Sequence, residues 1–376
     1  MTRRTMLASA AGATLASLEL GCAARRKSIS SIPKVPIHSL PPVACSPERV
    51  IRTVAGLRPF RPSGFVVRTD RIENKVIIHN YGHGGAGITL SSGTAQLALE
   101  EAERSGHTEF AVLGCGVVGL STARLFQRRG SAVTIYTKDM PPNTTSNIAA
   151  GWWAPDFLFE PGRQGSSFSA QYVRAAKIAH RYYQNLTNDY YGIRWLPMYA
   201  LSNGAEREPS KQGPFPEIDE LFIDSRNLLR DEDPFPVVRA ERFWSMLIEP
   251  PIYLNALLRD YLLAGGKIVI REFQNMQAVL ALKDPAIVNC TGLGTKTLFG
   301  DPELTPVKGQ LSVLLPQPEI AYCTFGPGDL YMFPRRDGIL LGGTHERGVS
   351  NLEPDPVQAA RIVNQHADLF RRMRSS

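Results

Sequence analysis

Cysteine is scarce in this chain: its 376 residues contain five cysteines and no Cys-x-x-Cys pair. The five are Cys22, Cys45, Cys115, Cys290 and Cys323. An odd number of widely spaced thiols argues against a disulfide scaffold and against a zinc site. Cys115 lies in a glycine-rich turn and Cys290 ends an apolar run, which is typical of small buried side chains. We therefore expect neither a disulfide framework nor a bound metal.

A hydrophobic run long enough to span a bilayer is also lacking at the start of the chain. Residues 6–18 are apolar and rich in alanine, but such a length suits an export signal better than a membrane span. Arg3 and Arg4 precede this stretch and resemble the twin-arginine signal of proteins that fold before export. We therefore expect residues 1–45 to be a signal segment and tether, and the protein to be periplasmic or anchored outside the cytoplasm.

Two alternatives stay open for this segment. Leu20-Gly21-Cys22 resembles a lipoprotein cleavage site, at which Cys22 would carry a lipid anchor, although Glu19 stands where an aliphatic residue is expected. Ordinary cleavage nearby is the other way to read it. If residues 1–45 are only a frayed terminus, the location is cytoplasmic instead.

No basic stripe interleaved with aromatic residues is present, although the formal net charge is +7. Part of the excess lies in Arg3, Arg4, Arg25, Arg26 and Lys27, ahead of the predicted folded region. Nucleic-acid binding requires a concentrated positive surface with base-stacking groups. We therefore expect no nucleic-acid partner, and the sequence leaves the oligomeric state open.

What the chain does contain is a strand-turn-helix-strand unit. The buried strand 110–113 runs into Gly114-Cys115-Gly116-Val117-Val118-Gly119, then a helix over 120–129 and a strand over 132–136. In such a unit the glycines permit a tight turn, close approach to a pyrophosphate and close helix packing. The spacing predicts a dinucleotide site at Gly114, Gly116, Val117, Val118 and Gly119.

The end of the second strand does not separate FAD from NADP. A ribose-binding acid is expected there, but Lys138 occupies that position and Asp139 comes one residue later. Asp139 could serve after a register shift, whereas Lys138 could meet a phosphate. An NADP-dependent dehydrogenase is therefore one alternative at this point.

Several further segments resemble the D-amino-acid oxidase and D-aspartate oxidase family. They are Gly-Leu-Arg-Pro-Phe-Arg-Pro at 56–62, His-Asn-Tyr-Gly-His-Gly-Gly at 79–85, Ala-Ala-Gly-Trp-Trp-Ala-Pro at 149–155 and Val-Asn-Cys-Thr-Gly at 288–292. The resemblance spans roughly residues 50–345. It implies FAD as cofactor and oxidative deamination of D-amino acids, with hydride transfer from the α-carbon to the flavin and O2 reduced to peroxide.

The order of these segments differs from the family, in which the glycine-rich turn comes first and the other two motifs come last. The resemblance therefore implies an α/β FAD-binding Rossmann-like domain plus a mostly antiparallel-sheet substrate domain, with circularly permuted connectivity. The predicted organisation is a substrate-domain strand with the first motif at 46–75, the FAD-binding domain at 76–155, a mixed, mainly substrate-domain segment at 156–285, a return to the FAD-binding domain at 286–300, and the substrate domain with a C-terminal helix at 301–376.

Site residues carried over from the family are implied in the same way. Arg58 and Tyr331 match groups that hold the substrate carboxylate, and Gly85 matches a carbonyl that accepts from the substrate amine. Positions matching cofactor contacts are Thr145, Ser146, Ala150, Gly151, Thr291 and Gly292, together with Gly82, Gly84, Gly85, Gly87, Ile88 and Thr89 of the second glycine-rich loop.

Departures from the family concern the substrate side. Ala154 stands where the family has a glutamine, Pro327 stands near a missing second tyrosine, and His345 matches no family role. Fewer polar groups predict an altered range of amino-acid substrates. A non-catalytic flavin-binding surface protein is therefore the second alternative to the oxidase.

Overall fold

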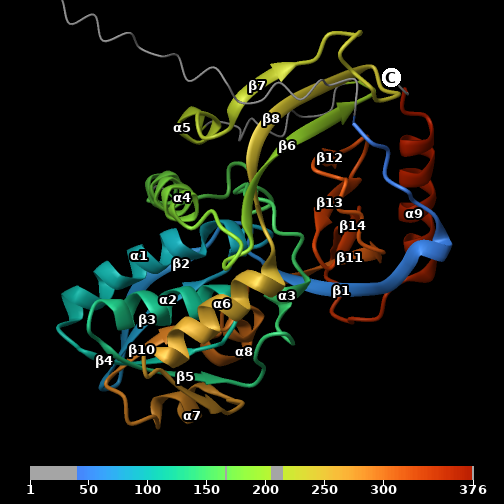
Figure 1. Cartoon of the computed structure of the whole chain (residues 1–376). Helices are drawn as coiled ribbons and strands as arrows, with labels where there is room; N and C mark the ends of the chain where they lie inside the picture. The colour runs from blue at the N-terminus through green and yellow to red at the C-terminus, as the bar shows by residue number, and fades with distance from the viewer. Residues whose placement is uncertain (1–39, 166, 205–214, 375–376) are drawn as a thin grey trace, which may run out of the picture. The chain divides into compact units, whose positions relative to one another are not determined.

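The computed structural model describes residues 40–165, 167–204 and 215–374, which form two β-sheets with helices on their faces (Figure 1). The predicted signal segment, including Arg3, Arg4 and Cys22, lies outside the described residues apart from its last six positions. In the part of the chain that is described, no helix combines the length and apolarity needed to cross a bilayer. The mixed α/β architecture with two sheets agrees with the predicted fold class.

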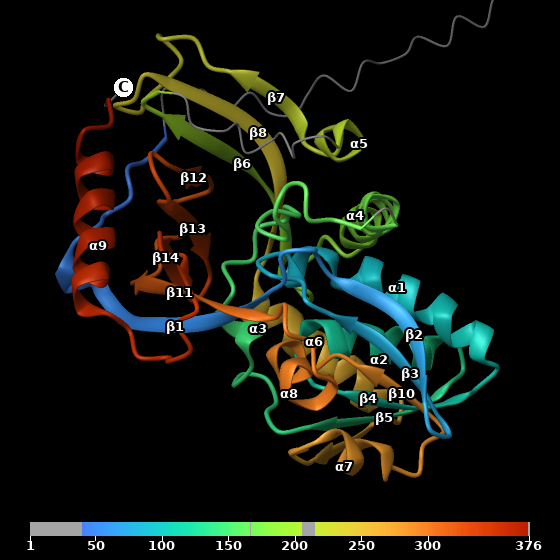
Figure 2. The ribbon, with the colours of Figure 1, turned by 180° about the vertical axis from the view of Figure 1, so that it is seen from behind.

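A six-stranded sheet forms the centre of the first layer system, in the order β2-β3-β10-β4-β5-β9. Its members are β2 (Val66–Ile72), β3 (Lys75–Tyr81), β10 (Ala286–Asn289), β4 (Glu109–Leu113), β5 (Ala132–Thr137) and β9 (Lys267–Ile270). The last five strands run parallel, and β2 pairs antiparallel with β3 at the edge. Figure 2 shows these strands from behind.

Helices cover both faces of this sheet because its buried strands are apolar on both sides. Alternate residues such as Ile78 and Val112 join a core with α1 (Gly87–Ser105), α2 (Val117–Arg128) and α6 (Pro250–Leu263). Ile77 and Ala111 point the other way, into a core with α7 (Met276–Leu280) and α8 (Thr295–Phe299). The strand period of two therefore places neighbouring residues in different cores.

A nine-stranded, mostly antiparallel sheet forms the second layer, in the order β1-β11-β14-β13-β12-β6-β8-β7, with β15 also paired to β11. The strands are β1 (Val50–Phe60), β6 (Ile193–Ser202), β7 (Ile223–Asn227), β8 (Arg239–Ile248), β11 (Thr305–Leu314), β12 (Cys323–Phe325), β13 (Tyr331–Arg335), β14 (Gly338–Gly342) and β15 (Glu346–Arg347). Among these pairs, β12 and β6 run parallel.

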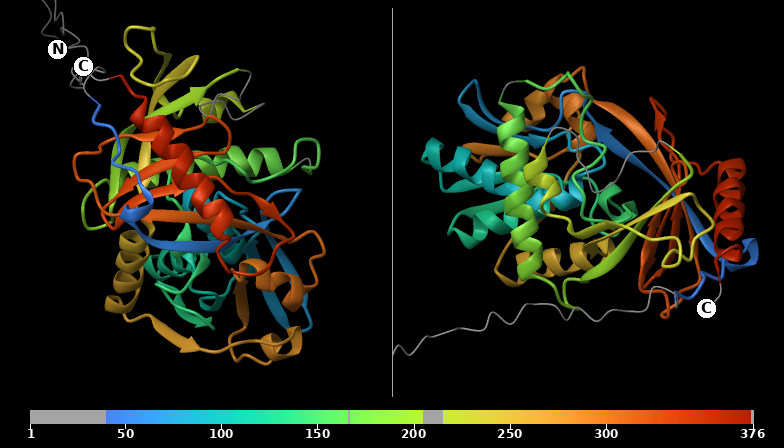
Figure 3. Two further views of the ribbon diagram at one scale, coloured as in Figure 1. Left: turned by 90° about the vertical axis from the view of Figure 1, so that its right-hand side faces the viewer. Right: turned by 90° about the horizontal axis from the view of Figure 1, so that it is seen from above.

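The last helix, α9 (Pro356–Arg371), packs along the nine-stranded sheet (Figure 3). Asp355 caps it by accepting hydrogen bonds from the backbone N–H groups of Val357 and Gln358. Ile362 and Phe370 lie in a core with β14 and β6. The remaining elements are η2 (Pro47–Arg49), α3 (Thr145–Ile148), α4 (Phe168–Asn185), α5 (Pro216–Asp219) and η3 (Gly292–Gly294).

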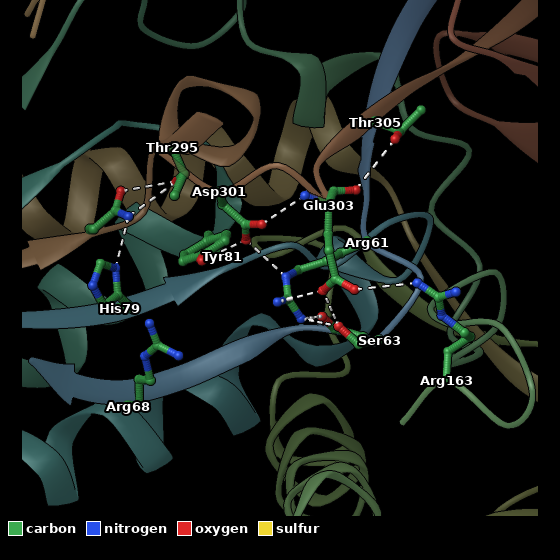
Figure 4. Close-up of polar contacts among 12 residues, drawn as sticks. Arg61, Ser63, Arg68, His79, Tyr81, Arg163, Thr295, Asp301, Glu303 and Thr305 are labelled. Carbon is green, nitrogen blue, oxygen red and sulfur yellow. Dashed lines mark hydrogen bonds and ion pairs between the residues drawn. The ribbon is translucent and has the colours of Figure 1, made fainter. Parts of the chain in front are cut away.

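Four connections run between the two sheets in the described chain, and an ion-pair cluster joins two of them, the β1–β2 and β10–β11 connections (Figure 4). Arg61, between β1 and β2, binds Asp301 at 2.8 Å and Glu303 at 2.6 Å, both in the segment between α8 and β11. Tyr81 donates a hydrogen bond to Asp301 at 2.8 Å. The second arginine of the 56–62 motif is therefore occupied by internal carboxylates, which gives it a structural role.

The boundary predicted at residue 75 falls inside the six-stranded sheet. The segment 46–75 contains β1, which lies in the nine-stranded sheet, but also β2, which pairs with β3 from Val66↔Tyr81 to Ile72↔Lys75. The motif at 56–62 thus ends at the crossing between sheets. The sequence did not reveal this because β2 is half exposed and shows no distinct hydrophobic pattern.

Candidate active site

Glycine-rich turns gather at the carboxyl ends of the parallel strands. Gly114-Cys115-Gly116 follows β4, Cys290-Thr291-Gly292 follows β10, and residues 82–86 follow β3 (Figure 2). In open α/β sheets this edge is where ligands bind, because strand order changes direction there and helix N-termini face the crevice. The topology therefore brings these three predicted cofactor segments to the same edge of the sheet.

The first turn shows why glycine is required at two of its positions. Gly114 has a φ of +104°, and a Cβ there would lie 2.7 Å from the carbonyl oxygen of Cys290. A Cβ on Gly119 would collide with the carbonyl oxygen of Gly114. At Gly116, by contrast, an added Cβ would meet one neighbour within 4 Å, the Ser146 hydroxyl at 3.2 Å. Gly116 therefore keeps space free in front of α2.

Two helix N-termini lie close together at this space. A Cβ added to Gly87, at the start of α1, would lie 3.9 Å from Val117 at the start of α2. Neither helix has a side-chain cap from its N-cap residue. The backbone N–H groups of Val118 and of Ile88 belong to these first turns, where unpaired N–H groups and the helix dipole favour an anion.

The predicted segments around residues 145–151 line the same region. The Ser146 hydroxyl accepts a hydrogen bond from the Val117 N–H at 3.0 Å. Thr145 begins α3, and Ala150 and Gly151 follow it. Gly151 has a φ of +96°, and its carbonyl accepts from the Ile248 N–H at 2.7 Å. This segment therefore connects the first glycine turn to β8 of the nine-stranded sheet.

Thr89 connects the second glycine loop to the segment that carries Ala154. Its hydroxyl donates to the Ala154 carbonyl at 2.9 Å and accepts from the Ala154 N–H at 3.3 Å. Thr89 and Ala154 are both buried. The start of α1 is thereby fixed against residues 152–154, which places the two predicted cofactor segments side by side.

Thr291 and Gly292 are ordered by a residue that sequence reasoning missed. The side-chain oxygen Oδ1 of Asn289 accepts from the Thr291 N–H at 3.2 Å and from the Thr291 hydroxyl at 2.7 Å. The Asn289 amide donates toward His79 Nδ1 at 3.1 Å, and His79 Nε2 lies 3.2 Å from the Asp70 carboxylate. Burial lowers the pKa of His79 to about 4, so its ring is neutral at neutral pH. Asn289 lay in a recognised motif, but its contacts depend on β3 and β10 being neighbours.

Lys138 and Asp139 lie at the end of β5, beside the first turn. The Gly114 N–H donates to the Tyr136 carbonyl at 2.8 Å, which fixes this proximity. Both side chains are exposed, and Lys138 Nζ lies 3.8 Å from the Asp139 carboxylate. The lysine charge is thus partly compensated by its neighbour.

Arg58 reaches the second glycine loop from the nine-stranded sheet. The carbonyl of Pro59 accepts from the Gly84 N–H at 2.9 Å, and the Phe157 carbonyl accepts from the Gly85 N–H at 2.9 Å. The Arg58 guanidinium carbon lies 5.6 Å from the centre of the Phe157 ring. Arg58 and Gly85 therefore both lie next to Phe157.

Tyr331 reaches Arg58 through strand register. Arg58 lies on β1, which pairs with β11. β11 in turn pairs with β14, and Tyr331 of β13 pairs with Gly342 of β14. Burial raises the pKa of the Tyr331 hydroxyl, while the adjacent Arg58 guanidinium acts in the opposite direction. The tyrosine therefore stays protonated and can donate a hydrogen bond. Phe157 and His345, whose rings lie 4.7 Å apart, join this group without having been predicted as site residues.

These features define a dinucleotide-binding α/β protein whose second sheet presents an arginine and a tyrosine to the nucleotide edge, an arrangement suited to oxidation of a small carboxylate-bearing molecule. The chain belongs to the FAD dependent oxidoreductase family, whose family model matches residues 109–375. The predicted family resemblance, enzyme class and FAD cofactor are confirmed by this match. The NADP-dependent alternative is set aside for the same reason.

Individual relatives agree with the family match. A D-amino-acid oxidase from Rubrobacter xylanophilus is 31% identical over 269 residues, covering 70% of this chain and 78% of the relative. A D-aspartate oxidase from Homo sapiens is 30% identical over 264 residues, covering 68% and 74%. The structure of a glycine oxidase from Bacillus cereus ATCC 14579 superposes with a TM-score of 0.52 at 16% identity, covering 70% and 78%, and supports the fold.

FAD fits the residues that are present. The open position at Gly116 and the facing N-termini of α1 and α2 suit the pyrophosphate, and Thr291-Gly292 borders the same edge. Gly82, Gly84 and Gly87 leave little side-chain bulk along the second loop. The Gly84 conformation, with a φ of +51°, is one that a larger residue would adopt only under strain.

Replacing Gly116 by valine tests whether the open space in front of α2 holds the FAD pyrophosphate. Because a Cβ there would approach only the Ser146 hydroxyl within 4 Å and the backbone φ of −75° suits any residue, we expect the apoprotein to keep its melting temperature. The added methyl groups would occupy the space before α2, so FAD affinity should fall at least about tenfold. Quenching of FAD fluorescence on titration measures this affinity. Unchanged FAD binding would exclude Gly116 from the pyrophosphate site.

Proposed function

We propose that this oxidoreductase catalyses FAD-dependent oxidative deamination of D-amino acids, with O2 as electron acceptor. Arg58 carries the proposal. Its guanidinium is half-buried, and among the described residues no carboxylate lies within 4.0 Å of it, whereas the neighbouring Arg61 binds Asp301 and Glu303. A partly buried arginine without an internal anion favours an anionic ligand. An amino-acid carboxylate supplies one, and the oxidases named above give the substrate class.

The residues of this chain would hold the substrate in one orientation. Arg58 binds the α-carboxylate through two parallel N–H groups, and the protonated Tyr331 donates to the same carboxylate. The carbonyl of Gly85 accepts from the substrate amine, and the peptide group that carries it is fixed because the Ala86 N–H of the same peptide donates to the His83 carbonyl at 2.9 Å. Three fixed contacts set the handedness of the α-carbon, which gives selectivity for one enantiomer.

When bound, FAD supplies the two-electron oxidation by taking a hydride from the α-carbon and passing the electrons to O2, which forms peroxide. The imino acid that leaves is hydrolysed by water. No strong side-chain base is needed if orientation is fixed. His83 does not offer one: burial lowers its pKa to about 3, its ring stacks on Phe65, and Nε2 lies 3.0 Å from Thr94. His83 therefore orders the loop.

Substituting Arg58 by alanine tests the substrate site. We expect the FAD-bound variant to release peroxide from D-amino acids with a lower kcat/KM. The loss of transition-state stabilisation should be about 2–4 kcal/mol, or roughly 30- to 900-fold in kcat/KM, because a charged hydrogen-bonded contact is lost. The wild-type holoenzyme should release peroxide from D-amino acids and not from their L-enantiomers. Both are measured with a coupled peroxidase assay across paired enantiomers.

The matched variant for this test is Arg58→Lys, which keeps the charge but loses the two parallel N–H groups. Its kcat/KM should lie between those of wild type and Arg58→Ala. Near-normal turnover of Arg58→Ala would remove this arginine from the substrate site. FAD retention without peroxide from any D-amino acid would favour the non-catalytic flavin-binding alternative.

The chain order supports a circular permutation of the family fold. The family match starts at residue 109, the first residue of β4, while β3 and α1 of the same sheet precede it. The ends of the described residues lie close together, because the Tyr322 hydroxyl is 2.9 Å from the Pro41 carbonyl and 3.9 Å from the Met373 sulfur. A circular permutation opens the chain of the original fold at one connection, so the two new chain ends should lie close together.

Restoring the relatives' order tests the permutation. A chain that runs from residue 107 to 374 and continues through a short flexible linker into residues 40–106 keeps every sheet contact. We expect it to bind FAD and to retain kcat/KM within about twofold, because only an exposed turn is opened. Far-ultraviolet circular dichroism and peroxide release measure the outcome. Loss of FAD binding would contradict the rotated order.

We further propose export through the twin-arginine signal, with Cys22 as a lipid anchor. The motif at Arg3-Arg4 and the Leu-Gly-Cys sequence support this, as does the need to acquire FAD before export. Replacing both Arg3 and Arg4 by lysine should retain the protein in the cytoplasm on cell fractionation, and Cys22→Ser should release it from membranes. The pair Arg25→Lys with Arg26→Lys is the control. Unchanged fractionation of the first pair would support the cytoplasmic alternative.

A further inference from the structure

The Asp329 carboxylate lies beside His345, and the Phe157 ring lies between His345 and Arg58 in this chain of contacts. His345 Nδ1 is 3.9 Å from the Asp329 carboxylate, and the His345 ring is 4.7 Å from that of Phe157. The Arg58 guanidinium carbon lies 5.6 Å from the centre of the same Phe157 ring. We refer to Arg58, Tyr331, His345 and Asp329 as the rim cluster.

Asp329 is held at this rim by the backbone. It lies in the connection between β12 and β13, two residues before Tyr331. A Cβ added to Gly343 would lie 3.4 Å from the Asp329 carbonyl and 3.2 Å from Leu330, so the glycine lets this connection pack closely. The Asp329 side chain is 73% exposed, whereas that of His345 is 28% exposed. The carboxylate is therefore open to an arriving molecule while its backbone is fixed.

The arginines nearby do not neutralise Asp329. Arg347 pairs with Glu160, and Arg61 pairs with Asp301 and Glu303. In the described part of the chain, no lysine or arginine lies within 4.0 Å of the Asp329 carboxylate, and His345 is its one ion-pair neighbour. Burial, with help from the Arg58 charge, lowers the pKa of His345 to about 4, so this ring adds no positive charge at neutral pH.

The charge count of the rim cluster changes when substrate binds. Arg58 contributes one positive charge, and Asp329 contributes one negative charge. An α-carboxylate on Arg58 cancels the positive charge and leaves the Asp329 carboxylate uncompensated at the rim. A second carboxylate on the substrate side chain is then repelled, whereas an ammonium or guanidinium is attracted.

We propose that the rim cluster selects D-amino acids with a cationic side chain over those with an acidic one, and that Asp329 is the specificity-determining residue. This inference rests on the proposed function. D-Lysine and D-ornithine carry an ammonium on a flexible stem that extends away from the α-carboxylate. D-Aspartate and D-glutamate would instead bring a second anion toward the Asp329 carboxylate.

The test compares kcat/KM of the holoenzyme for D-lysine and D-glutamate, with the uncharged D-norleucine as reference. Wild type should prefer D-lysine. Asp329→Asn should reduce the D-lysine to D-glutamate ratio by about fivefold, the upper range for an exposed ion pair, and Asp329→Lys should reduce it further. Raising the salt concentration should reduce the wild-type ratio, because exposed charges are screened.

Glu103→Gln is the matched control, since it removes an equal charge from an exposed position at the end of α1. Its ratio should equal that of wild type. A wild-type ratio at or below one, or one that Asp329→Asn leaves unchanged while D-norleucine is oxidised, would overturn the inference and leave the proposed function standing. Absence of peroxide from every D-amino acid would instead overturn the proposed function itself.

Discussion

Close backbone packing at Gly114 is the constraint on which the nucleotide site depends. The turn after β4 touches the Cys290 carbonyl on one side and admits no side chain at Gly119 on the other. Three segments that are far apart in the sequence therefore meet with their backbones in contact. The same contacts leave Gly116 open and bring the first turns of α1 and α2 together, so packing and ligand binding use one arrangement.

The second sheet depends on this arrangement through its links to the first. β1 ends at Phe60, and the chain enters β2 of the other sheet six residues later, while the segment after α8 leads back to β11. Arg61, Asp301 and Glu303 join these two crossings. Arg58 is thereby held beside the second glycine loop. The two arginines of one short motif have different roles because only Arg61 meets internal carboxylates.

Chain order and spatial order are separate properties in this fold. β3 and α1 precede β4 in the chain, yet they occupy neighbouring positions in the same layers. Stability and ligand binding depend on contacts and not on which loop is covalently closed. A family match that covers residues 109–375 can therefore coexist with a predicted nucleotide site that also includes residues 82–89.

The sequence by itself determined the features that rest on local rules. Glycines with positive φ, the strand period of two and the strand-turn-helix order predicted β4, α2, β5 and the cradle, because neighbouring residues carry that information. Its prediction for the substrate residues came from resemblance. Only the tertiary structure decided that β2 belongs to the six-stranded sheet, that Asn289 orders the turn after β10, and that Phe157 lies beside Arg58, with His345 next to Phe157 and Asp329 next to His345. These contacts join residues far apart in sequence through strand register and sheet crossings, and no local pattern encodes which distant strands become neighbours.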